Sequence, residues 1–309
     1  MAAKIAITGA AGLVGQNLIP RLKARGYRDI VAIDKHPANT ALLRRLHPDI
    51  TVVEVDLAQA GAWEQAVAAV DVIVICHAQI GGLDRAVYTR NNITATERLL
   101  AAVSRAGVYL VHVSSSVVKS MAKDDYVRSK EAQEKLVLQS GFPAIVFRPT
   151  LMFGWFDRKH LGWLARFMQR TPLFPIPGHG RYLRQPLYVG DFCDIVMACI
   201  ERRPTGEYNI TGLEPIDYVD LIRAVRDVSG ASARIVPVPY RLFWSMLFVY
   251  GLFSRDPPFT TKQLEALATP DVFEVIDWPG LFGVKPTPLK TALAETYRDP
   301  VYSRIVLEF

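Results

Sequence analysis

Tyr126 and Lys130 are the pair of side chains best suited to proton chemistry. They stand four residues apart in the segment Tyr-Val-Arg-Ser-Lys, a spacing that places both on one face of a helix. A free phenol has a pKa of about 10, and a nearby ammonium group favours the phenolate. A tyrosine in that setting can give and take a proton near neutral pH. We therefore expect Tyr126 to be an acid/base group and Lys130 to tune it.

Three consecutive serines, Ser114 to Ser116, precede this pair and follow the apolar run Leu110–Val113. A serine hydroxyl at the end of a predicted strand can hold a substrate oxygen beside the tyrosine. We expect Ser115 to do so. Ser116 is a close alternative, because three serines in a row leave the register ambiguous.

A glycine-rich turn lies near the N-terminus, where Thr-Gly-Ala-Ala-Gly-Leu-Val-Gly follows an apolar run and opens a helical pattern. Glycine allows backbone angles closed to other residues, and its missing side chain lets the backbone approach a pyrophosphate. A helix N-terminus adds unpaired N–H groups and a partial positive charge. The turn predicts a dinucleotide site, with a purely structural turn as the alternative. The residues expected to contact the dinucleotide here are Gly9, Ala11, Gly12, Leu13, Val14 and Gly15.

Asp34 stands at the end of the next apolar run, 19 residues after Gly15. An acidic residue about 20 positions on accepts hydrogen bonds from the adenosine ribose, and its charge repels a 2′-phosphate. We therefore prefer NAD to NADP, although the neighbouring Lys35 argues for NADP. Asp56 and Leu57, after the third run, are expected to border the adenine, with a helix N-cap as the alternative for Asp56.

These motifs lie on an alternation of short β-branched runs and helical patterns, which predicts βαβ units and an α/β fold of the Rossmann type. The doubly wound parallel sheet should be covered by helices on both faces. The expected strands are Ile5–Ile7, Ile30–Ile33, Val52–Val55, Val72–Ile75, Leu110–Val113 and Ile145–Phe147, and the expected helices lie near 13–25, 39–46, 60–69, 91–106 and 126–139.

The regular alternation of strand and helix patterns ends after Pro149. Residues 171–180 are rich in Pro and Gly and predict a loop, Leu187–Val189 a strand that returns to the sheet, and 191–201 a helix. From about 214 the pattern is mainly helical. We expect an NAD-binding Rossmann domain of 1–150 plus about 186–213. A smaller, mainly helical substrate-binding lobe should comprise about 151–185 and 214–309.

Composition narrows the function classes. Half of the 309 residues are hydrophobic and 21% are charged, which excludes a wholly disordered chain. The net charge of +6 is spread along the chain, and its densest cluster, Arg21, Lys23, Arg25 and Arg28, is expected to be a solvated helix face. No RNA-binding signature or zinc-finger spacing occurs, so we expect neither nucleic acid nor a metal.

Cysteine usage and the apolar segments bear on location. The three cysteines include no Cys-x-x-Cys pair, so we expect no disulfide framework, and no secretory pattern opens the chain. Both observations predict a cytoplasmic protein. The longest apolar stretch, Leu242–Phe253, has 12 residues where a spanning helix needs about 20.

The motifs, in this order, resemble the extended short-chain dehydrogenase/reductases, and within them the NAD-dependent epimerase/dehydratase family with its sugar-nucleotide epimerases. The resemblance implies that Lys130 also holds the ribose, and that Asn92 and Pro149 lie in the cofactor region, where Asn92 supports the active-site helix. The matching segments are Thr8-Gly9-x-x-Gly12-x-x-Gly15, Asp34, Asp56-Leu57, Asn92-Ile93-Thr94-Ala95-Thr96, Ser114-Ser115-Ser116, Tyr126-x-x-x-Lys130, Arg148-Pro149, Tyr188-Val189-Gly190-Asp191 and Gly283-Val284-Lys285-Pro286-Thr287-Pro288-Leu289.

The same resemblance places Arg184 where these epimerases carry an arginine that binds the substrate diphosphate. A guanidinium fork suits phosphate oxygens, with an ordinary surface arginine as the alternative. Two features depart from the family pattern. Val117-Val118-Lys119 stands where a Thr-Asp-Glu triplet would continue, which argues against 4,6-dehydration, and Leu151 stands where many sugar-nucleotide enzymes have Asn.

The segment 240–253 is hydrophobic nearly all round. One interpretation is a helix that is buried or lies in a dimer contact. The other is an exposed apolar surface that admits a lipid-linked substrate or touches a membrane.

We expect an NAD-dependent epimerase that forms a homodimer and transiently oxidises a secondary alcohol, at C4, of a nucleotide- or lipid-linked sugar. One alternative is a net NAD(P)-dependent oxidoreductase, either a 4-ketosugar reductase or an enzyme like a hydroxysteroid dehydrogenase. Another is a non-catalytic dinucleotide-binding module.

Overall fold

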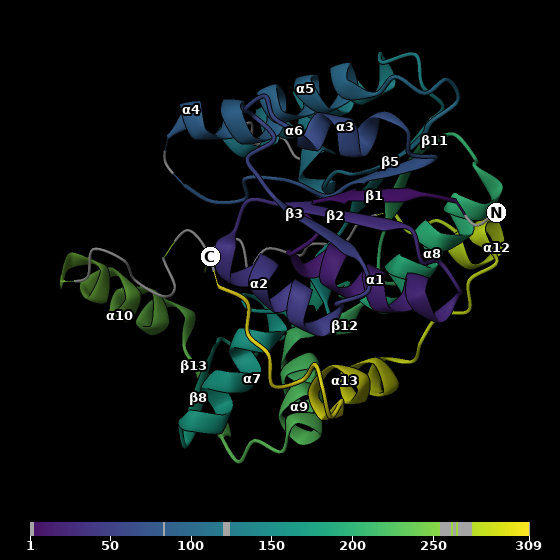
Figure 1. Ribbon diagram of the computed structural model, residues 1–309. Coiled ribbons are helices and arrows are strands. Elements are labelled where there is room, and N and C mark those ends of the chain that lie inside the picture. The colour runs from purple at the N-terminus through teal and green to yellow at the C-terminus, as the bar shows by residue number, and fades with distance from the viewer. Residues whose placement is uncertain are drawn as a thin grey trace.

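A seven-stranded parallel sheet forms the centre of the computed structural model, which describes residues 3–82, 84–119, 124–253, 261, 264 and 274–308. Its strand order, β11-β6-β5-β4-β1-β2-β3, is the Rossmann order with one further strand at the β6 edge (Figure 1). The predicted fold class is confirmed. The strands are β1 (Ile5–Thr8), β2 (Ile30–Asp34), β3 (Thr51–Glu54), β4 (Val72–Ile75), β5 (Tyr109–Val113), β6 (Ala144–Pro149) and β11 (Gly206–Ile210).

Helices bury both faces of this sheet. Side chains alternate along each strand, so that Ile5 and Ile7 pack into one cluster and Ala6 into the other. The first cluster lies under α1 (Leu13–Ala24) and α8 (Val189–Arg202). The second lies under α3 (Trp63–Ala68), α5 (Ala95–Ala102) and α6 (Asp125–Leu138).

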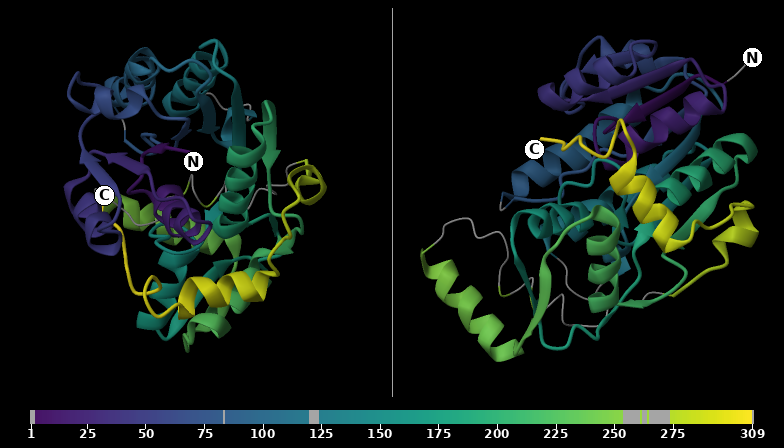
Figure 2. Two further views of the ribbon diagram at one scale, coloured as in Figure 1. Left: turned by 45° about the vertical axis from the view of Figure 1, so that its right-hand side comes forward. Right: turned by 90° about the horizontal axis from the view of Figure 1, so that it is seen from below.

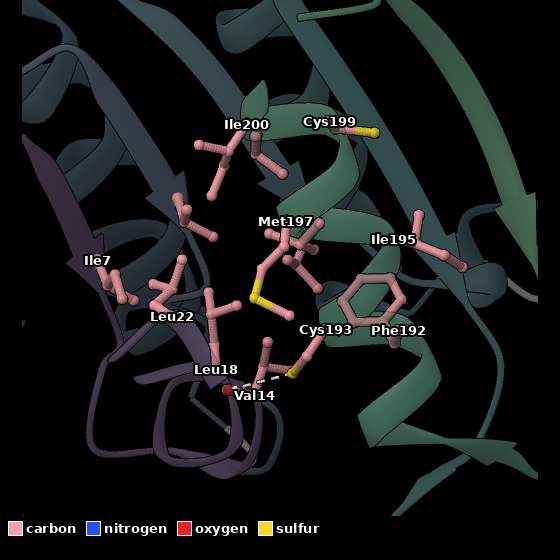
Figure 3. Close-up of a cluster of buried hydrophobic side chains, with 14 of the residues drawn as sticks. Ile7, Val14, Leu18, Leu22, Phe192, Cys193, Ile195, Met197, Cys199 and Ile200 are labelled. Carbon is pink, nitrogen blue, oxygen red and sulfur yellow. Dashed lines mark hydrogen bonds between the residues drawn. The ribbon is translucent and has the colours of Figure 1, made fainter. Parts of the chain in front are cut away.

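Figure 3 shows the contact between α1 and α8, where Leu18 and Leu22 face Met197. Cys193 belongs to this core, and its Sγ lies 4.0 Å from the carbonyl oxygen of Val14. All three cysteines are free, in agreement with the predicted lack of a disulfide framework, and buried cysteines behave as small apolar residues.

A second core lies below the sheet (Figure 2), where the main helices are α7 (Leu161–Arg170), α9 (Tyr218–Ser229) and α13 (Leu289–Arg298). Three two-stranded ribbons accompany them: β7 (Met152–Phe153) with β10 (Leu187–Tyr188), β9 (Leu183–Arg184) with β12 (Ile216–Asp217), and β8 (Leu173–Pro177) with β13 (Arg234–Val238). The further helices are α2 (Pro37–Leu46), α4 (Arg85–Tyr88), the π-helix η1 (Thr89–Thr94), the 3-10 turn η2 (Ser116–Lys119), α10 (Tyr240–Phe253) and α12 (Trp278–Phe282).

Two predictions for this half are wrong. The strand at Leu187–Tyr188 does not return to the central sheet but pairs with β7, and β11 takes the place beside β6. The predicted loop 171–180 contains the strand β8. Prolines are tolerated there because each strand of a two-stranded ribbon is an edge strand, where a missing N–H is harmless. The exact domain boundaries stay a prediction.

Three members of the basic cluster pair with acidic residues: Arg21 and Lys23 on α1, and Arg25 directly after it. Arg21 contacts Glu295 of α13 at 2.6 Å, Lys23 contacts Asp49, and Arg25 lies 3.3 Å from Asp194. Arg21 also stands 4.3 Å from the centre of the Trp155 ring and donates to the Tyr188 hydroxyl at 3.0 Å. The last turn of α1 is thereby bound to the lobe.

None of the helices in the described ranges combines the length and the apolarity that crossing a bilayer requires.

Candidate active site

Ser115 and Tyr126 meet beyond the carboxyl end of β5. Asp124 caps α6, since its carboxylate accepts the N–H of Val127 at 2.8 Å, and this places Tyr126 in the first turn. The side chain of Ser115 lies close enough to the phenol of Tyr126 to lower the pKa of that phenol. Ser116 is buried and begins the turn η2. The geometry therefore supports Ser115 over Ser116 as the serine that works with Tyr126.

The pKa of Tyr126 shifts in the direction opposite to the prediction. Burial raises it above the usual value near 10, with smaller contributions from Asp124 and Tyr88, while the side chain of Ser115 lowers it. Lys130 directs its ammonium group elsewhere, to the carbonyl oxygen of Val113 at 3.0 Å. The tuning role of Lys130 stays a prediction.

Lys130 is one of the largest fully buried side chains, at 1% exposure, and burial lowers its pKa to about 7. Its second partner is Oε1 of Gln133, at 2.5 Å. Sequence reasoning missed Gln133, although its position three residues after Lys130 puts the two on one helix face. The Nε2 of Gln133 in turn donates to Thr96 Oγ1 at 2.9 Å and lies 3.2 Å from the ring of His77.

His77 connects this network to the glycine turn. Its Nδ1 lies 2.8 Å from Thr8 Oγ1 and its Nε2 lies 3.0 Å from Thr96 Oγ1. Burial, together with the charges of Lys130 and Lys35, lowers the pKa of His77 to about 3. His77 is therefore a neutral, fully hydrogen-bonded residue that joins β1 and β4 to α5.

Asn92 joins the loop after β4 to the helix α6, which bears Tyr126 and Lys130. It is buried within the π-helix η1, donates to Ser129 Oγ at 2.8 Å and accepts the N–H of Gln79 at 2.6 Å. Ser129 directly precedes Lys130. This geometry fits the supporting role that the resemblance implies, while a direct contact of Asn92 with the cofactor stays a prediction.

The glycine turn fits a pyrophosphate. Gly9 has φ +67°, and a Cβ there would lie 2.6 Å from the backbone nitrogen of His77. A Cβ on Gly15 would lie 2.3 Å from the carbonyl oxygen of Ala10. Gly12 begins α1 without a side-chain cap, and the first turn holds no acidic residue. The turn therefore offers helical N–H groups and open backbone to an anion.

Asp34 is held beside this turn. Its carboxylate accepts the N–H of Ala11 at 3.0 Å and that of His36 at 3.1 Å, and each oxygen retains a lone pair that a ribose hydroxyl could use. Lys35, the residue that argued for NADP, donates to Asn91 Oδ1 at 2.7 Å. Its ammonium group is thus engaged by η1, which supports the preference for NAD.

Asp56 does not cap a helix. Its Oδ1 accepts the N–H of Ala58 at 3.0 Å and its Oδ2 pairs with Arg90 at 2.7 Å, while α3 begins only at Trp63. The N-cap alternative is therefore wrong. The adenine contacts of Asp56 and the buried Leu57 stay predictions, as does the cofactor contact of Pro149, which is buried at the end of β6.

Arg184 lies on the ribbon strand β9, opposite Ile216, and not in a loop. Its guanidinium group donates to the carbonyl oxygen of Leu183 at 2.9 Å and stands 5.4 Å from the centre of the Tyr182 ring. Its contact with a diphosphate stays a prediction. Leu151, before β7, is 39% exposed.

The motifs at 188–191 and 283–289 contact each other. The carboxylate of Asp191 accepts both the N–H of Thr287, at 3.0 Å, and its hydroxyl, at 2.5 Å. This pair fastens α8 to the segment before α13. Over the residues that the structure describes, no group of three or more His, Cys, Asp or Glu could hold a metal ion.

The chain is similar to known proteins in sequence and in fold. The family model described as "NAD dependent epimerase/dehydratase family" matches residues 5–211. A ketoreductase of Stigmatella aurantiaca, named for 4-hydroxy-2-methyl-3-oxo-4-farnesyl-3,4-dihydroquinoline-1-oxide, is 27% identical over 76% of each chain. The ceramide reductase of Caulobacter vibrioides is 24% identical over 76% of this chain and 73% of its own.

Among solved structures, the Bordetella bronchiseptica enzyme WbmG in complex with NAD and UDP superposes with a TM-score of 0.75. The match covers 100% of this chain and 98% of that one, at 19% identity. At that identity the likeness establishes the fold.

The first prediction concerns Asp34. The wild type should bind NAD more tightly than NADP, because the carboxylate repels a 2′-phosphate. Asp34→Asn removes the charge but keeps an oxygen for the N–H of Ala11, so it should narrow the difference in affinity while the turn stays intact. Calorimetric titration with both oxidised dinucleotides measures this. NADP binding as tightly as NAD to the wild type would contradict the argument.

The second prediction concerns Lys130. Its pKa of about 7 in the folded chain lies below the roughly 10.4 of an unfolded lysine, so the folded state binds fewer protons between these values. Its contribution to stability therefore rises with pH through this window, by about 1.5 kcal/mol from pH 7 to 8.5. Lys130→Met lacks this term. Urea unfolding at the two pH values should show that the free energy of unfolding of the wild type rises by that amount relative to the methionine variant. A difference between the two proteins that does not change with pH would refute the assignment.

Proposed function

Because the chain belongs to the NAD-dependent epimerase/dehydratase family, we propose that it epimerises a nucleotide- or lipid-linked sugar by transient oxidation of a secondary alcohol, at C4. The match to the family model confirms the resemblance inferred from the order of the motifs, and the chain is an enzyme of the extended short-chain dehydrogenase/reductase type. The observation that supports the proposal is the proximity of Ser115 to Tyr126, at the sheet edge that also bears the glycine turn.

The two side chains have separate tasks. Tyr126 takes the proton of the substrate hydroxyl as that carbon becomes a carbonyl, and returns it when the alcohol is formed again. Ser115 donates a hydrogen bond to the same substrate oxygen and so orients it. NAD, when bound, would supply the acceptor and later the donor of a hydride, and return of the hydride to the opposite face of the carbonyl would invert the carbon. One proton and one hydride leave and both return, so the cycle has no net oxidation.

Several features favour the lipid-linked form of the substrate. Leu151 is exposed where many sugar-nucleotide enzymes carry Asn, and α10 exposes a large apolar surface. The two relatives described above are named for a farnesylated quinoline and for a ceramide. Arg184 would serve a diphosphate in either substrate.

A net reductase that acts on an apolar ketone is the second candidate, and the names of these two relatives favour it. The two functions differ in their cofactor balance. An epimerase turns over with catalytic NAD, whereas a reductase consumes one NADH for each alcohol formed. Nuclear magnetic resonance of the sugar product, with NADH absorbance followed in parallel, separates them on polyprenyl diphosphate sugars and on uridine diphosphate sugars.

Tyr126→Phe should lower turnover on the true substrate by about 10²–10⁴-fold, because it removes the group that moves the proton. NAD affinity should stay near that of the wild type. Ser116→Ala is the matched control and should keep most of the activity, whereas Ser115→Ala should lose much of it. Near wild-type turnover by Tyr126→Phe would remove Tyr126 from the mechanism and leave the dinucleotide-binding module as the better description.

Arg184→Ala should weaken binding of a diphosphate-linked substrate by about 10- to 150-fold, the size of a charge-assisted contact of about 1.5–3 kcal/mol. Arg184→Lys should recover only part of this, because a point charge replaces a fork. NAD affinity should not change in either variant. Calorimetry with uridine and thymidine diphosphate sugars and with a short-chain polyprenyl diphosphate sugar is the test. If none of them binds the wild type, the apolar ketone becomes the leading substrate.

A further inference from the structure

The helix α10 is exposed over most of its surface, and within it Phe243, Trp244 and Leu247 are partly covered. It comprises 14 residues, from Tyr240 to Phe253, and none of them is buried, which contradicts the predicted alternative of a buried helix. Leu242 is 54% exposed, Met246 57% and Phe253 86%. Figures 1 and 2 show α10 standing out from the lobe at the end of β13, away from the central sheet.

The exposed apolar side chains are not confined to one stripe. Leu242, Met246, Val249 and Phe253 follow the spacing of a single helix face. Phe248 and Leu252 lie to one side of that face and Tyr250 to the other, because successive residues turn by about 100°. A second protein molecule docking on one face would leave the flanking side chains in water. Acyl chains can cover all of them at once.

The charged residues of β13 and α10 themselves are both basic. Between residues 228 and 253 the chain carries Arg234 and Arg241 and no Asp or Glu. Both arginines belong to exposed positions, one on β13 and the other in the first turn of α10. Tyr240 and Trp244 accompany them, and aromatic residues of this kind favour the headgroup region. The base of the helix therefore matches an anionic headgroup layer, and its apolar end matches the acyl chains.

The dimensions indicate how deeply such a helix can enter. Fourteen residues extend about 21 Å, which is less than the roughly 30 Å of a hydrocarbon core. In Figure 1 and in the right-hand view of Figure 2, α10 lies on the same side as the C-terminus. There Glu308 hydrogen-bonds Asn39, close to the carboxyl end of β2.

We propose that α10 is a membrane-docking helix that inserts its apolar side chains into one leaflet of an anionic bilayer, with Arg241 and Arg234 at the headgroups. This interaction does not require the epimerase activity, and either function above could operate from the docked state.

Vesicle flotation with the full-length protein tests the proposal. The wild type should float with vesicles of phosphatidylcholine and phosphatidylglycerol, and less with phosphatidylcholine alone. The combined variant Met246→Ser, Val249→Ser, Phe253→Ser should lower the partition coefficient by about tenfold or more, because three apolar side chains no longer enter the leaflet. A matched control replaces exposed apolar residues elsewhere, Leu138→Ser, Leu281→Ser and Val301→Ser, and should float like the wild type.

A second measurement locates the helix directly. Lipids brominated on the acyl chains should quench the fluorescence of the wild type more than that of Trp244→Phe, since Trp244 is the tryptophan carried by α10. Arg241→Gln should reduce the preference for anionic vesicles.

The proposal is overturned if the wild type does not float with either kind of vesicle, or if the α10 variant floats as well as its control. Sedimentation provides a further contrary outcome. A dimer that is lost in the α10 variant, together with no vesicle binding, would make a second copy of the chain the partner of α10.

Discussion

The contact between the backbone of Gly9 and the end of β4 is the constraint on which the rest of the site depends. A Cβ at Gly9 would lie 2.6 Å from the nitrogen of His77, so only glycine lets β1 and β4 end so close together. This is the point where the strand order reverses and where doubly wound sheets bind their ligands. Because the two strands meet there, His77 can reach Thr8 on one side and Thr96 on the other. Gln133 extends the same network to Lys130.

Burial governs the electrostatics of this network. Lys130 and His77 lie in one buried region, and burial lowers the pKa of each. The ring of His77 is therefore neutral and bridges two hydroxyl groups. Lys130 is held between a carbonyl oxygen and an amide oxygen, which are uncharged acceptors. A buried lysine with such partners loses part of its charge near neutral pH, and burial is the largest influence on the pKa of Tyr126.

Local patterns in the sequence predicted the parts of the site that depend on local structure. The glycine turn, Asp34 at the end of β2 and Tyr126 on α6 are each defined by a strand or helix and by spacing along the chain. The missed features depend on contacts that are distant in sequence. Gln133 matters because His77 lies beside it, and Asp56 is fixed by Arg90. Similarly, β8 forms because β13, about 60 residues later, pairs with it in spite of its prolines. Spacing rules cannot supply such partners.

The helix α1 carries a different function at each of its ends. Its first turn forms the cradle for an anion, and Arg21 in its last turn is fixed to Glu295, Tyr188 and the Trp155 ring. A helix of 12 residues is about 18 Å long and behaves as a stiff rod. Any movement of the lobe relative to the sheet must either break the Arg21 contacts or tilt this rod. A tilt of α1 would therefore also displace the glycine turn at its other end, because both sets of contacts belong to one helix.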